Sequence, residues 1–507
     1  MKNIYCTSFL LLFLLLMVSK QGISQQNSLP VSPNASSEAK ALLGMMYSIT
    51  GKHILSGQHN YPATMDRNSK FAEQYIGRKP VIWSSDMGFA EEGDTDSYLA
   101  RPDIVKEAIR QHKMGSIITI CWHAVPPTAD EPITFRPLPG ADPNNLNSVQ
   151  GQLTDEQFEA VLTPGTTLNK KWLAQMDTIA YFLKQLQEAH VPVLWRPYHE
   201  MNGSWFWWGG RTEGEFTTKA LYRGMFERFT QYHGLTNLVW VWNVDRVSRE
   251  GMEFDKFYPG NETLDILSLD VYGSDFAQSY YDGLMSLSKG KPLLFGEVGN
   301  PPSAKILDAQ PNWTSWVIWA GMVRNTTKEQ YQAMIDDPRV LFQEDAAYLH
   351  VINQFREKCK LGLIDPASNP MSGNWILNEQ KSKSNRGFAN SAYKMNIVQL
   401  GNELVIEKSF IVEWGEDRVS HETIMVSGLA VSSATQWGAQ QISTHKWDNG
   451  QLVINTIMTS TRDGQTTEMK SGEIWTINND RTELTIQSKA QTTRGEQESE
   501  LVYEKLK

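Results

Sequence analysis

Two glutamates stand where apolar, strand-like runs end. Glu200 lies in the segment 195–209, WRPYHEMNGSWFWWG, where an apolar run passes directly into Arg196 and His199 and then into a cluster of indoles. Glu297 ends the seventh run, 292–297, within the segment LLFGEVG, and we expect its flanking glycines to leave space for a ligand. Two facing carboxyl groups suit glycoside hydrolysis, in which one protonates the leaving oxygen and the other attacks the anomeric carbon or activates water. A separation of about 5 Å retains configuration and a wider one inverts it, and residue spacing alone does not supply this distance.

The residues beside Glu200 bear on how the two carboxyl groups are interpreted. Either glutamate alone is more simply a salt bridge at the end of a strand, whereas the pair favours catalysis. Positive charge on Arg196 and His199 can keep one carboxylate ionised while an apolar wall raises the pKa of the other. A buried ion pair explains Arg196 equally well.

Further candidates for contact with a ligand lie at the ends of other runs. Trp122 and His123 end the third run, where His123 is as consistent with a core histidine as with a ligand contact. Tyr272 ends the sixth run and can hydrogen-bond a carboxylate. Trp319, near the end of the eighth run, can form the floor of a sugar site.

Indoles are unevenly spread along the chain. Of the 17 tryptophans, twelve lie between Trp83 and Trp319. Exposed indoles stack on sugar rings, but core packing is the alternative use, which we expect for about half of them. Trp205, Trp207 and Trp208 can form a stacking platform, with at least one of them in the core.

Motifs for other chemistries do not occur in the sequence. It contains no His-x-His or His-Glu-x-x-His pair, no Walker loop, no Gly-x-Gly-x-x-Gly turn and no Gly-x-Ser-x-Gly elbow. We therefore expect neither a metal ion nor a cofactor.

Short apolar runs alternate with longer helical patterns over the first part of the chain. The helical patterns at 169–189 and 217–232 repeat their apolar residues every three or four positions. The eight runs span residues 53–58, 80–86, 116–123, 191–199, 237–243, 265–272, 292–297 and 316–320. Eight strands with eight crossovers predict an α/β fold, a (β/α)8 TIM barrel over 36–362, whose chemistry belongs at the carboxyl ends of the strands.

A second domain is predicted after a boundary rich in turn residues at 365–373. From Trp375 onward the pattern changes to short alternating strands, such as 403–407, 452–457, 473–477 and 483–487, some of them joined by Asn-Gly or Asp-Gly turns. This pattern predicts a smaller all-β antiparallel barrel or sandwich over 372–507.

Composition and the N-terminus restrict the partners and the compartment. With Lys+Arg 47 and Asp+Glu 57 the net charge is −10, so a nucleic-acid partner is disfavoured. Residues 1–24 have the basic start, apolar run and small residues of a signal peptide, which predicts export to a periplasmic or extracellular location. No later segment approaches twenty apolar residues, so we expect no membrane anchor after cleavage. Cys121 and Cys359 remain, and a disulfide between them is the less favoured alternative.

The residues described above resemble a known family. The segment 195–209, the CWH run at 121–123, GEVG at 296–299 and DPRV at 337–340 are similar to those of glycoside hydrolase family 26, over roughly 36–360. The resemblance implies a retaining (β/α)8 hydrolase that is usually a β-mannanase, with Glu200 as acid/base and Glu297 as nucleophile. It also implies substrate-binding positions, namely Trp122, His123, Arg196, His199, Trp205, Tyr272 and Trp319, with Tyr272 bonded to the nucleophile. Met201-Asn202 departs from the family pattern, in which an aromatic or aliphatic residue precedes Asp.

The expected function is therefore an endo-β-1,4-mannanase acting on mannan, glucomannan or galactomannan, as a monomer and without a cofactor. The same family includes enzymes that release mannobiose and enzymes that cut mixed-linkage β-glucan or β-1,3-xylan, and these remain alternatives. A non-catalytic polysaccharide-binding barrel is a further alternative, which retention of both carboxylates disfavours. Residues 372–507 are similar to lipocalin-like β-domains of exported proteins, with either glycan binding by their indoles or a spacer role.

Overall fold

The computed structural model describes residues 29–89, 97–142, 145–364, 369–435, 439–462, 465–492 and 495–506. The predicted signal peptide, residues 365–368 of the predicted linker and Trp437 lie outside this part of the chain. The chain divides into two compact units, Met1–Cys359 and Lys360–Lys507. No helix among the described residues is long and apolar enough to span a membrane.

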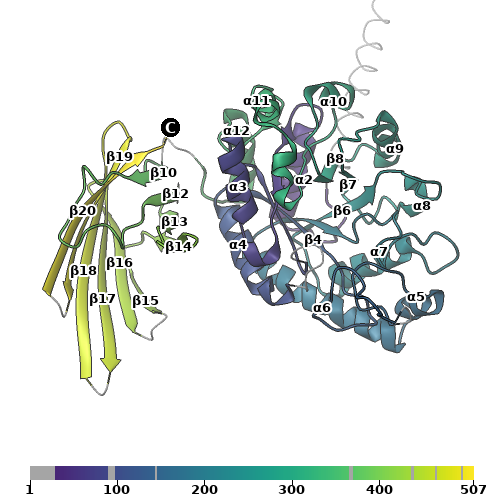
Figure 1. Ribbon diagram of the computed structural model, residues 1–507, viewed down its shortest axis with the longest axis horizontal. Helices are drawn as coiled ribbons and strands as arrows, with labels where there is room; N and C mark the ends of the chain where they lie inside the picture. Colours follow the sequence, from purple (N-terminus) through teal and green to yellow (C-terminus); the bar gives the residue numbers. More distant parts are fainter. Residues whose placement is uncertain are drawn as a thin grey trace, which may run out of the picture. The chain divides into compact units, whose positions relative to one another are not determined.

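A parallel sheet forms the centre of the first unit (Figure 1). Its seven strands are paired in chain order: β2 Gly57–His59, β3 Ile82–Asp86, β4 Ile117–Trp122, β5 Val193–Pro197, β6 Leu238–Asp245, β7 Ile266–Val271 and β8 Leu293–Val298. Each strand is buried along its whole length, as expected when helices cover one face of a sheet and the barrel interior the other. The predicted fold class is confirmed.

The eighth predicted run closes the barrel without forming a regular strand. Residues 313–319 lie between β8 and β2, where the Val298 amide donates to the Val317 carbonyl and the Ile318 amide donates to Gly57. Isolated parallel bridges replace a continuous ladder. The first predicted run, 53–58, is not a single barrel strand either. Its start forms β1, Ile54–Leu55, which pairs with β9, Val340–Leu341, in a separate two-stranded sheet.

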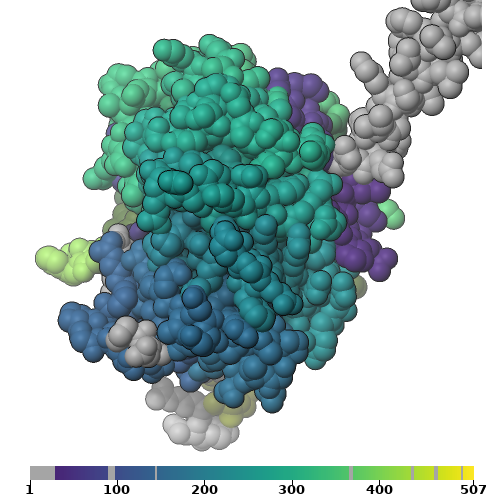
Figure 2. All heavy atoms as spheres, turned by 90° about the vertical axis from the view of Figure 1, so that its right-hand side faces the viewer, coloured from purple at the N-terminus to yellow at the C-terminus, as the bar shows by residue number. Residues whose placement is uncertain are grey.

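Helices surround this sheet (Figure 1). The patterns at 169–189 and 217–232 form α6, Thr167–Glu188, and α7, Thr218–Glu227, the latter continuing as one π-helical stretch, Arg228–Tyr232. Thr166 and Thr217 begin these helices, each accepting a hydrogen bond from a backbone amide of the first turn. The α-helices are α2 Ser37–Ile49, α3 Arg67–Ile76, α4 Arg101–Lys113, α5 Asp155–Leu162, α6 Thr167–Glu188, α7 Thr218–Glu227, α8 Phe254–Phe257, α9 Gln278–Ser288, α10 Ala304–Ala309, α11 Lys328–Ile335 and α12 Ala346–Lys358. In Figure 2, blue, teal and green segments from well-separated parts of the sequence adjoin on one face of this unit.

Indoles fill much of the space between sheet and helices. Ten of the twelve tryptophans between Trp83 and Trp319 are buried, more than the expected half. Trp205 and Trp319 are the two that keep solvent exposure. The thiols of Cys121 and Cys359 are free, so the alternative of a disulfide between them is wrong.

The second unit is one antiparallel sheet of eleven strands, which confirms the predicted all-β antiparallel domain. A core on one of its faces includes Trp375, Leu452, Trp475 and Ile486. A tight turn at Asn449 and Gly450, both with positive φ, joins two of its strands. The strands are β10 Gly373–Leu377, β11 Lys383–Ser384, β12 Lys394–Leu400, β13 Glu403–Phe410, β14 Arg418–Met425, β15 Ala430–Ala434, β16 Gln440–Asp448, β17 Gln451–Arg462, β18 Gln465–Ile477, β19 Glu483–Thr492 and β20 Gly495–Lys505.

Candidate active site

A cavity of about 400 Å³ lies at the carboxyl ends of the barrel strands. It is lined by Tyr61, Phe89, His123, Phe135, Gln150, His199, Glu200, Trp205, Phe206, Tyr272, Glu297, Trp319 and Met322. Seven of the nine residues singled out from the sequence are among these. Arg196 lies buried against the carboxylates, and Trp122 lies elsewhere.

Glu297 is held as an anion. Its Oε1 accepts a hydrogen bond of 2.6 Å from Arg196 Nη2, and its Oε2 accepts one of 2.6 Å from the Tyr272 hydroxyl. Burial alone would raise the pKa of this carboxyl, but the charge of Arg196 and the two donors outweigh it and hold the pKa below the ordinary 4.5. A buried ionised carboxylate at a cavity wall is suited to nucleophilic attack.

Glu200 is in the opposite electrostatic situation. Burial raises its pKa well above the ordinary value, and the negative charges of Asp270 and Glu297 add to that effect. The Trp205 indole donates to Glu200 Oε2 at 2.6 Å, and Asn243 Oδ1 accepts from the Glu200 amide at 2.8 Å. The backbone of Glu200 is left-handed, with φ 51°, and the Asn243 contact helps to hold that turn. A raised pKa lets this carboxyl group keep its proton to higher pH than an ordinary glutamate, so it can act as an acid.

The two glutamates lie close together. One carboxylate oxygen from each of Glu200, Asp270 and Glu297 lies within 4.8 Å of the other two. The separation of the Glu200 and Glu297 carboxyl groups is therefore that of a retaining glycosidase. An inverting enzyme needs about 6.5 Å or more between the two groups to admit a water molecule. Oxygens so arranged can also bind a cation, but Arg196 already donates to Asp270 and Glu297 and supplies that positive charge.

A polar layer beneath the carboxylates was missed from the sequence. Asn243 Nδ2 donates to Ser268 Oγ and to Asp270 Oδ1, both at 2.8 Å, and Arg196 Nη1 donates to Asp270 Oδ2 at 3.1 Å. The sequence contained two signals that pointed to this polar layer. Asn243 is the last residue of the fifth predicted run, and Asp270 precedes Tyr272 by two positions, which places both on one face of a strand.

Gly296 serves this layer rather than a ligand. A Cβ atom there would meet Ser268 Oγ at 2.6 Å and side-chain atoms of Asn243 and Asp270 at 2.7 Å. The expectation that glycines beside Glu297 make room for a ligand is therefore wrong for Gly296, because its missing side chain accommodates the polar layer.

Gly296→Ala is expected to lower the free energy of unfolding by about 1–3 kcal/mol, because three packed polar groups must move. Denaturant titration measures this change. Gly44→Ala is the matched control, since α2 leaves open space there and the added methyl should stabilise the helix by up to about 1 kcal/mol. Equal stability of Gly296→Ala and the parent protein would contradict the packing argument.

Two histidines form one wall of the cavity. His123 Nδ1 contacts Asp86 Oδ2 at 2.7 Å, and Asp86 also accepts hydrogen bonds from the Gly88 and Phe89 amides. Burial would raise the pKa of Asp86, but contact with His123 holds it below its ordinary value. His199 lies 3.8 Å from Glu297, and burial lowers its pKa well below 6.5, so it is neutral.

Comparison with known proteins agrees with this geometry. The family model described as Glycosyl hydrolase family 26 matches residues 31–347, more than half of the chain. The chain belongs to glycosyl hydrolase family 26. The second unit lies entirely beyond the end of that match, and its lipocalin-like resemblance remains a prediction.

Individual relatives of the family 26 unit share about a quarter to a third of their residues with it. A mannan endo-1,4-beta-mannosidase of Thermothelomyces thermophilus is 32% identical over 302 residues, which cover 59% of this chain and 58% of that protein. One from Bacillus subtilis is 30% identical over 314 residues, covering 58% and 79%. GH26A from a Muricauda species is a solved structure that is 36% identical, with a TM-score of 0.56, covering 61% of this chain and 98% of its own. A beta-mannanase from a symbiotic protist of the termite Reticulitermes speratus, solved with a gluco-manno-oligosaccharide, is 25% identical, with a TM-score of 0.51 and coverage of 62% and 96%.

Only some of the predicted indoles of the family 26 unit reach the cavity. Trp205 lies over Gly203, where a Cβ atom would meet the indole at 2.2 Å. Trp319 stacks on His59 with ring centroids 4.1 Å apart. Trp207 and Trp208 are fully buried and donate to the carbonyls of Ala124 and His199. The predicted three-indole platform is therefore reduced to Trp205.

Trp122 does not reach the cavity in the structure. Its side chain is buried on the helix-facing side of β4, the side shared by Ile118 and Ile120, and its ring packs near Tyr198. Neighbouring side chains on a strand point to opposite faces, so His123 enters the cavity and Trp122 cannot. The placement of Trp122 at a ligand site is thus corrected to the core.

The departure from the family pattern at Met201-Asn202 has a structural use. Asn202 Nδ2 donates to the carbonyls of Asp245 and Met252, and its Oδ1 accepts from the Asp245 amide at 2.7 Å. An amide side chain can make all three contacts, whereas a carboxylate there has no donor. Asn202 therefore ties the loop after Glu200 to the end of β6.

Proposed function

We propose that the first unit is a retaining endo-β-1,4-mannanase. The observation that carries the proposal is the pair of carboxyl groups within 4.8 Å of one another, one ionised and the other with a raised pKa. The relatives at about 30% identity are named mannan endo-1,4-beta-mannosidases, which supports mannan as the substrate.

The proposed reaction has two displacements. Glu297 attacks the anomeric carbon while Glu200 gives its proton to the leaving oxygen, so the glycosidic bond breaks as the ester to Glu297 forms. Glu200, now ionised, then takes a proton from water, whose oxygen displaces Glu297 and restores both side chains. Arg196 and Tyr272 stabilise the carboxylate that leaves in the second step.

Product analysis tests the proposal. Linear β-1,4-mannan should yield mixed oligosaccharides from the first minutes, and chromatography over time measures them. Mannobiose alone at the earliest times would replace endo action by release from chain ends. Cleavage of lichenan or β-1,3-xylan with none of mannan would move the substrate to another β-glycan, and no cleavage of any of them would reject the proposal.

The pH profile should follow the two carboxyl groups. Activity needs Glu297 ionised and Glu200 protonated, so kcat/KM should fall on the acid side at a pH below 4.5 and on the alkaline side well above it. Tyr272→Phe removes a donor that lowers the pKa of Glu297, and the acid limb should therefore move to higher pH. Tyr181→Phe, on the outside of α6, is the control and should leave both limbs in place. An unmoved acid limb in Tyr272→Phe would show that this hydroxyl does not tune Glu297.

We also propose that the protein is exported. The basic, apolar and small-residue pattern of residues 1–24 supports cleavage after Ser24. N-terminal sequencing of the mature protein from its own cells tests this, and an intact Met1 would contradict it.

A further inference from the structure

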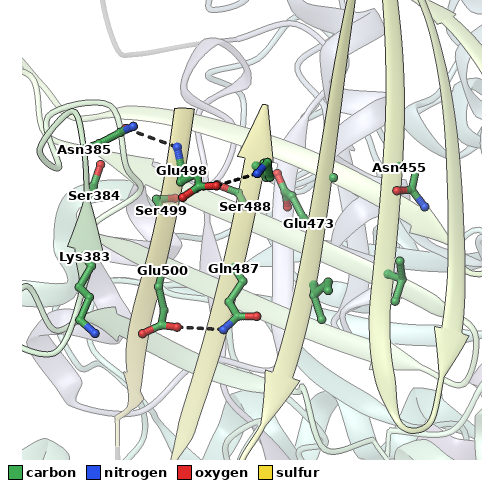
Figure 3. A pocket seen from close by; sticks show the side chains of 14 residues that line it. Lys383, Ser384, Asn385, Asn455, Glu473, Gln487, Ser488, Glu498, Ser499 and Glu500 are labelled. Atoms are coloured by element: carbon green, nitrogen blue, oxygen red, sulfur yellow. Dashed lines mark hydrogen bonds and ion pairs between the residues drawn. The ribbon is translucent and has the colours of Figure 1, made fainter. Parts of the chain in front are cut away.

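The second unit has a groove on the face of its sheet that points away from its core (Figure 3). Leu452, Trp475 and Ile486 pair across three strands and face the core, so their chain neighbours, such as Val453 and Ile474, face the other way. The groove encloses about 710 Å³, against about 400 Å³ at the carboxylate pair. It is lined by Lys383, Ser384, Asn385, Val453, Asn455, Gly472, Glu473, Ile474, Gln487, Ser488, Lys489, Glu498, Ser499 and Glu500.

A small apolar surface with a depression forms part of the groove floor. Val453 on β17 and Ile474 on β18 are direct cross-strand partners, and Ile474 is 37% exposed. Gly472, the partner of Asn455, lies two positions from Ile474 on the same face and contributes no side chain. Exposed aliphatic groups beside a bare backbone suit the C–H face of a pyranose ring.

The surrounding groups are polar and balanced in charge. Gln487 Nε2 donates to Glu500 Oε2 at 2.9 Å, as a dashed line in Figure 3 indicates. Lys489 Nζ pairs with Glu498 Oε1 at 2.8 Å. Glu473 accepts from the Trp475 indole on the core side at 2.8 Å. Of the three lining glutamates, Glu473 turns its carboxylate to the core side. On the groove face Lys383 and Lys489 therefore offset Glu498 and Glu500, so this face favours neither an anion nor a cation. Amide, carboxylate and ammonium groups together hydrogen-bond the hydroxyls of a neutral ligand.

We propose that this groove is a second glycan-binding site, which holds a neutral polysaccharide chain while the first unit cleaves it. The identification of that polysaccharide as β-mannan rests on the proposed function. Among the described residues no aromatic ring lines the groove, so affinity comes from hydrogen bonds and aliphatic contact and is modest. The site is also not the one expected from the indoles, because Trp375 and Trp475 are fully buried in the core and the exposed Trp414 does not line this groove.

Filling the depression tests the proposal. In Gly472→Ile the new Cβ meets Asn455 Oδ1 at 3.4 Å and Ile454 O at 3.9 Å, both ordinary contacts, and a β-branched residue suits a strand, so the variant should fold. Thr423→Ile adds the same side chain to an exposed position of β14 and is the matched control. Both are made in the full chain carrying Glu297→Gln, which prevents degradation, and Trp205→Ala, which weakens retention by the cleft.

Sedimentation with insoluble mannan measures binding. Gly472→Ile should bind about tenfold more weakly than its parent, whereas Thr423→Ile should bind equally. Binding should change little between low and high salt, because the ligand is neutral. Equal binding by Gly472→Ile and its parent would overturn the proposal, and so would binding that is lost at high salt.

The groove proposal and the proposed activity can be rejected independently of each other. With Glu297 and Trp205 intact, Gly472→Ile should turn over soluble mannotetraose at the parent rate. If the parent chain cleaved no mannan, the proposed function would fall, but sedimentation with insoluble β-1,3-xylan or with another neutral β-glycan would still test the groove. Retention of none of these glycans would overturn the groove site whatever the activity.

Discussion

Glu297→Gln is expected to lower kcat on β-mannan by about four orders of magnitude or more, while binding of manno-oligosaccharides stays measurable. The amide has the size of the carboxylate, and its oxygen can still accept from Arg196 while the Tyr272 hydroxyl accepts from its nitrogen. Folding should therefore survive. What is lost is the anionic oxygen that forms the bond to the anomeric carbon, and no other group within the polar layer replaces it, because Asp270 is engaged by Arg196 and Asn243.

Initial rates on mannan and titration with mannotetraose measure the two expected effects. Glu156→Gln is the matched control, since it makes the same exchange of carboxylate for amide on the exposed side of α5 and should keep full activity. Turnover by Glu297→Gln at the parent rate would reject Glu297 as the nucleophile. Loss of binding together with turnover, accompanied by a lowered unfolding midpoint, would instead assign Glu297 a structural role beside Arg196.

Much of the barrel could be predicted because its strands are buried on both faces. Such strands appear in the sequence as short continuous apolar runs, and β3 to β8 lie within the predicted runs or no more than two residues beyond their ends. Part of the closing segment 313–319 also appears as an apolar run, but its irregular bridges depend on the backbone of β8 and of β2, the latter some 260 residues earlier in the sequence. The split of the first run into β1 and β2 has the same origin, since β1 pairs with β9 some 285 residues later.

The residues of the site that stand at strand ends could be predicted from the sequence, whereas those of the polar layer beneath the carboxylates were missed. Glu200 and Glu297 follow apolar runs directly, so the topology of a barrel is enough to bring them to one face. Whether a neighbour such as Trp122 faces the cavity depends on strand parity, which the sequence does not show when both faces are apolar. Gly296 illustrates a further limit, because the three side chains that need its missing Cβ come from two other strands, β6 and β7.

Glu200→Ala is expected to reduce kcat/KM on mannan by about two to four orders of magnitude, but to reduce attack on a dinitrophenyl mannoside far less. The sugar leaving group of mannan needs the proton that Glu200 carries, whereas dinitrophenolate leaves without one. Glu200 lines the cleft, so its truncation opens space to solvent rather than creating a buried void. A burst of dinitrophenol should precede slow turnover, because the second displacement still lacks a base to activate water.

Azide provides the control that separates acid/base loss from general damage. It attacks the anomeric carbon of the glycosyl-enzyme as an anion, breaks the ester to Glu297 and needs no deprotonation, so it should speed dinitrophenyl turnover in Glu200→Ala and give a mannosyl azide of retained configuration. The same addition should leave the parent protein unchanged, since water activated by Glu200 already completes its second step. Equal losses on mannan and on the activated mannoside, with no response to azide, would remove Glu200 from the acid/base role and reduce its raised pKa to a consequence of burial beside Asp270 and Glu297.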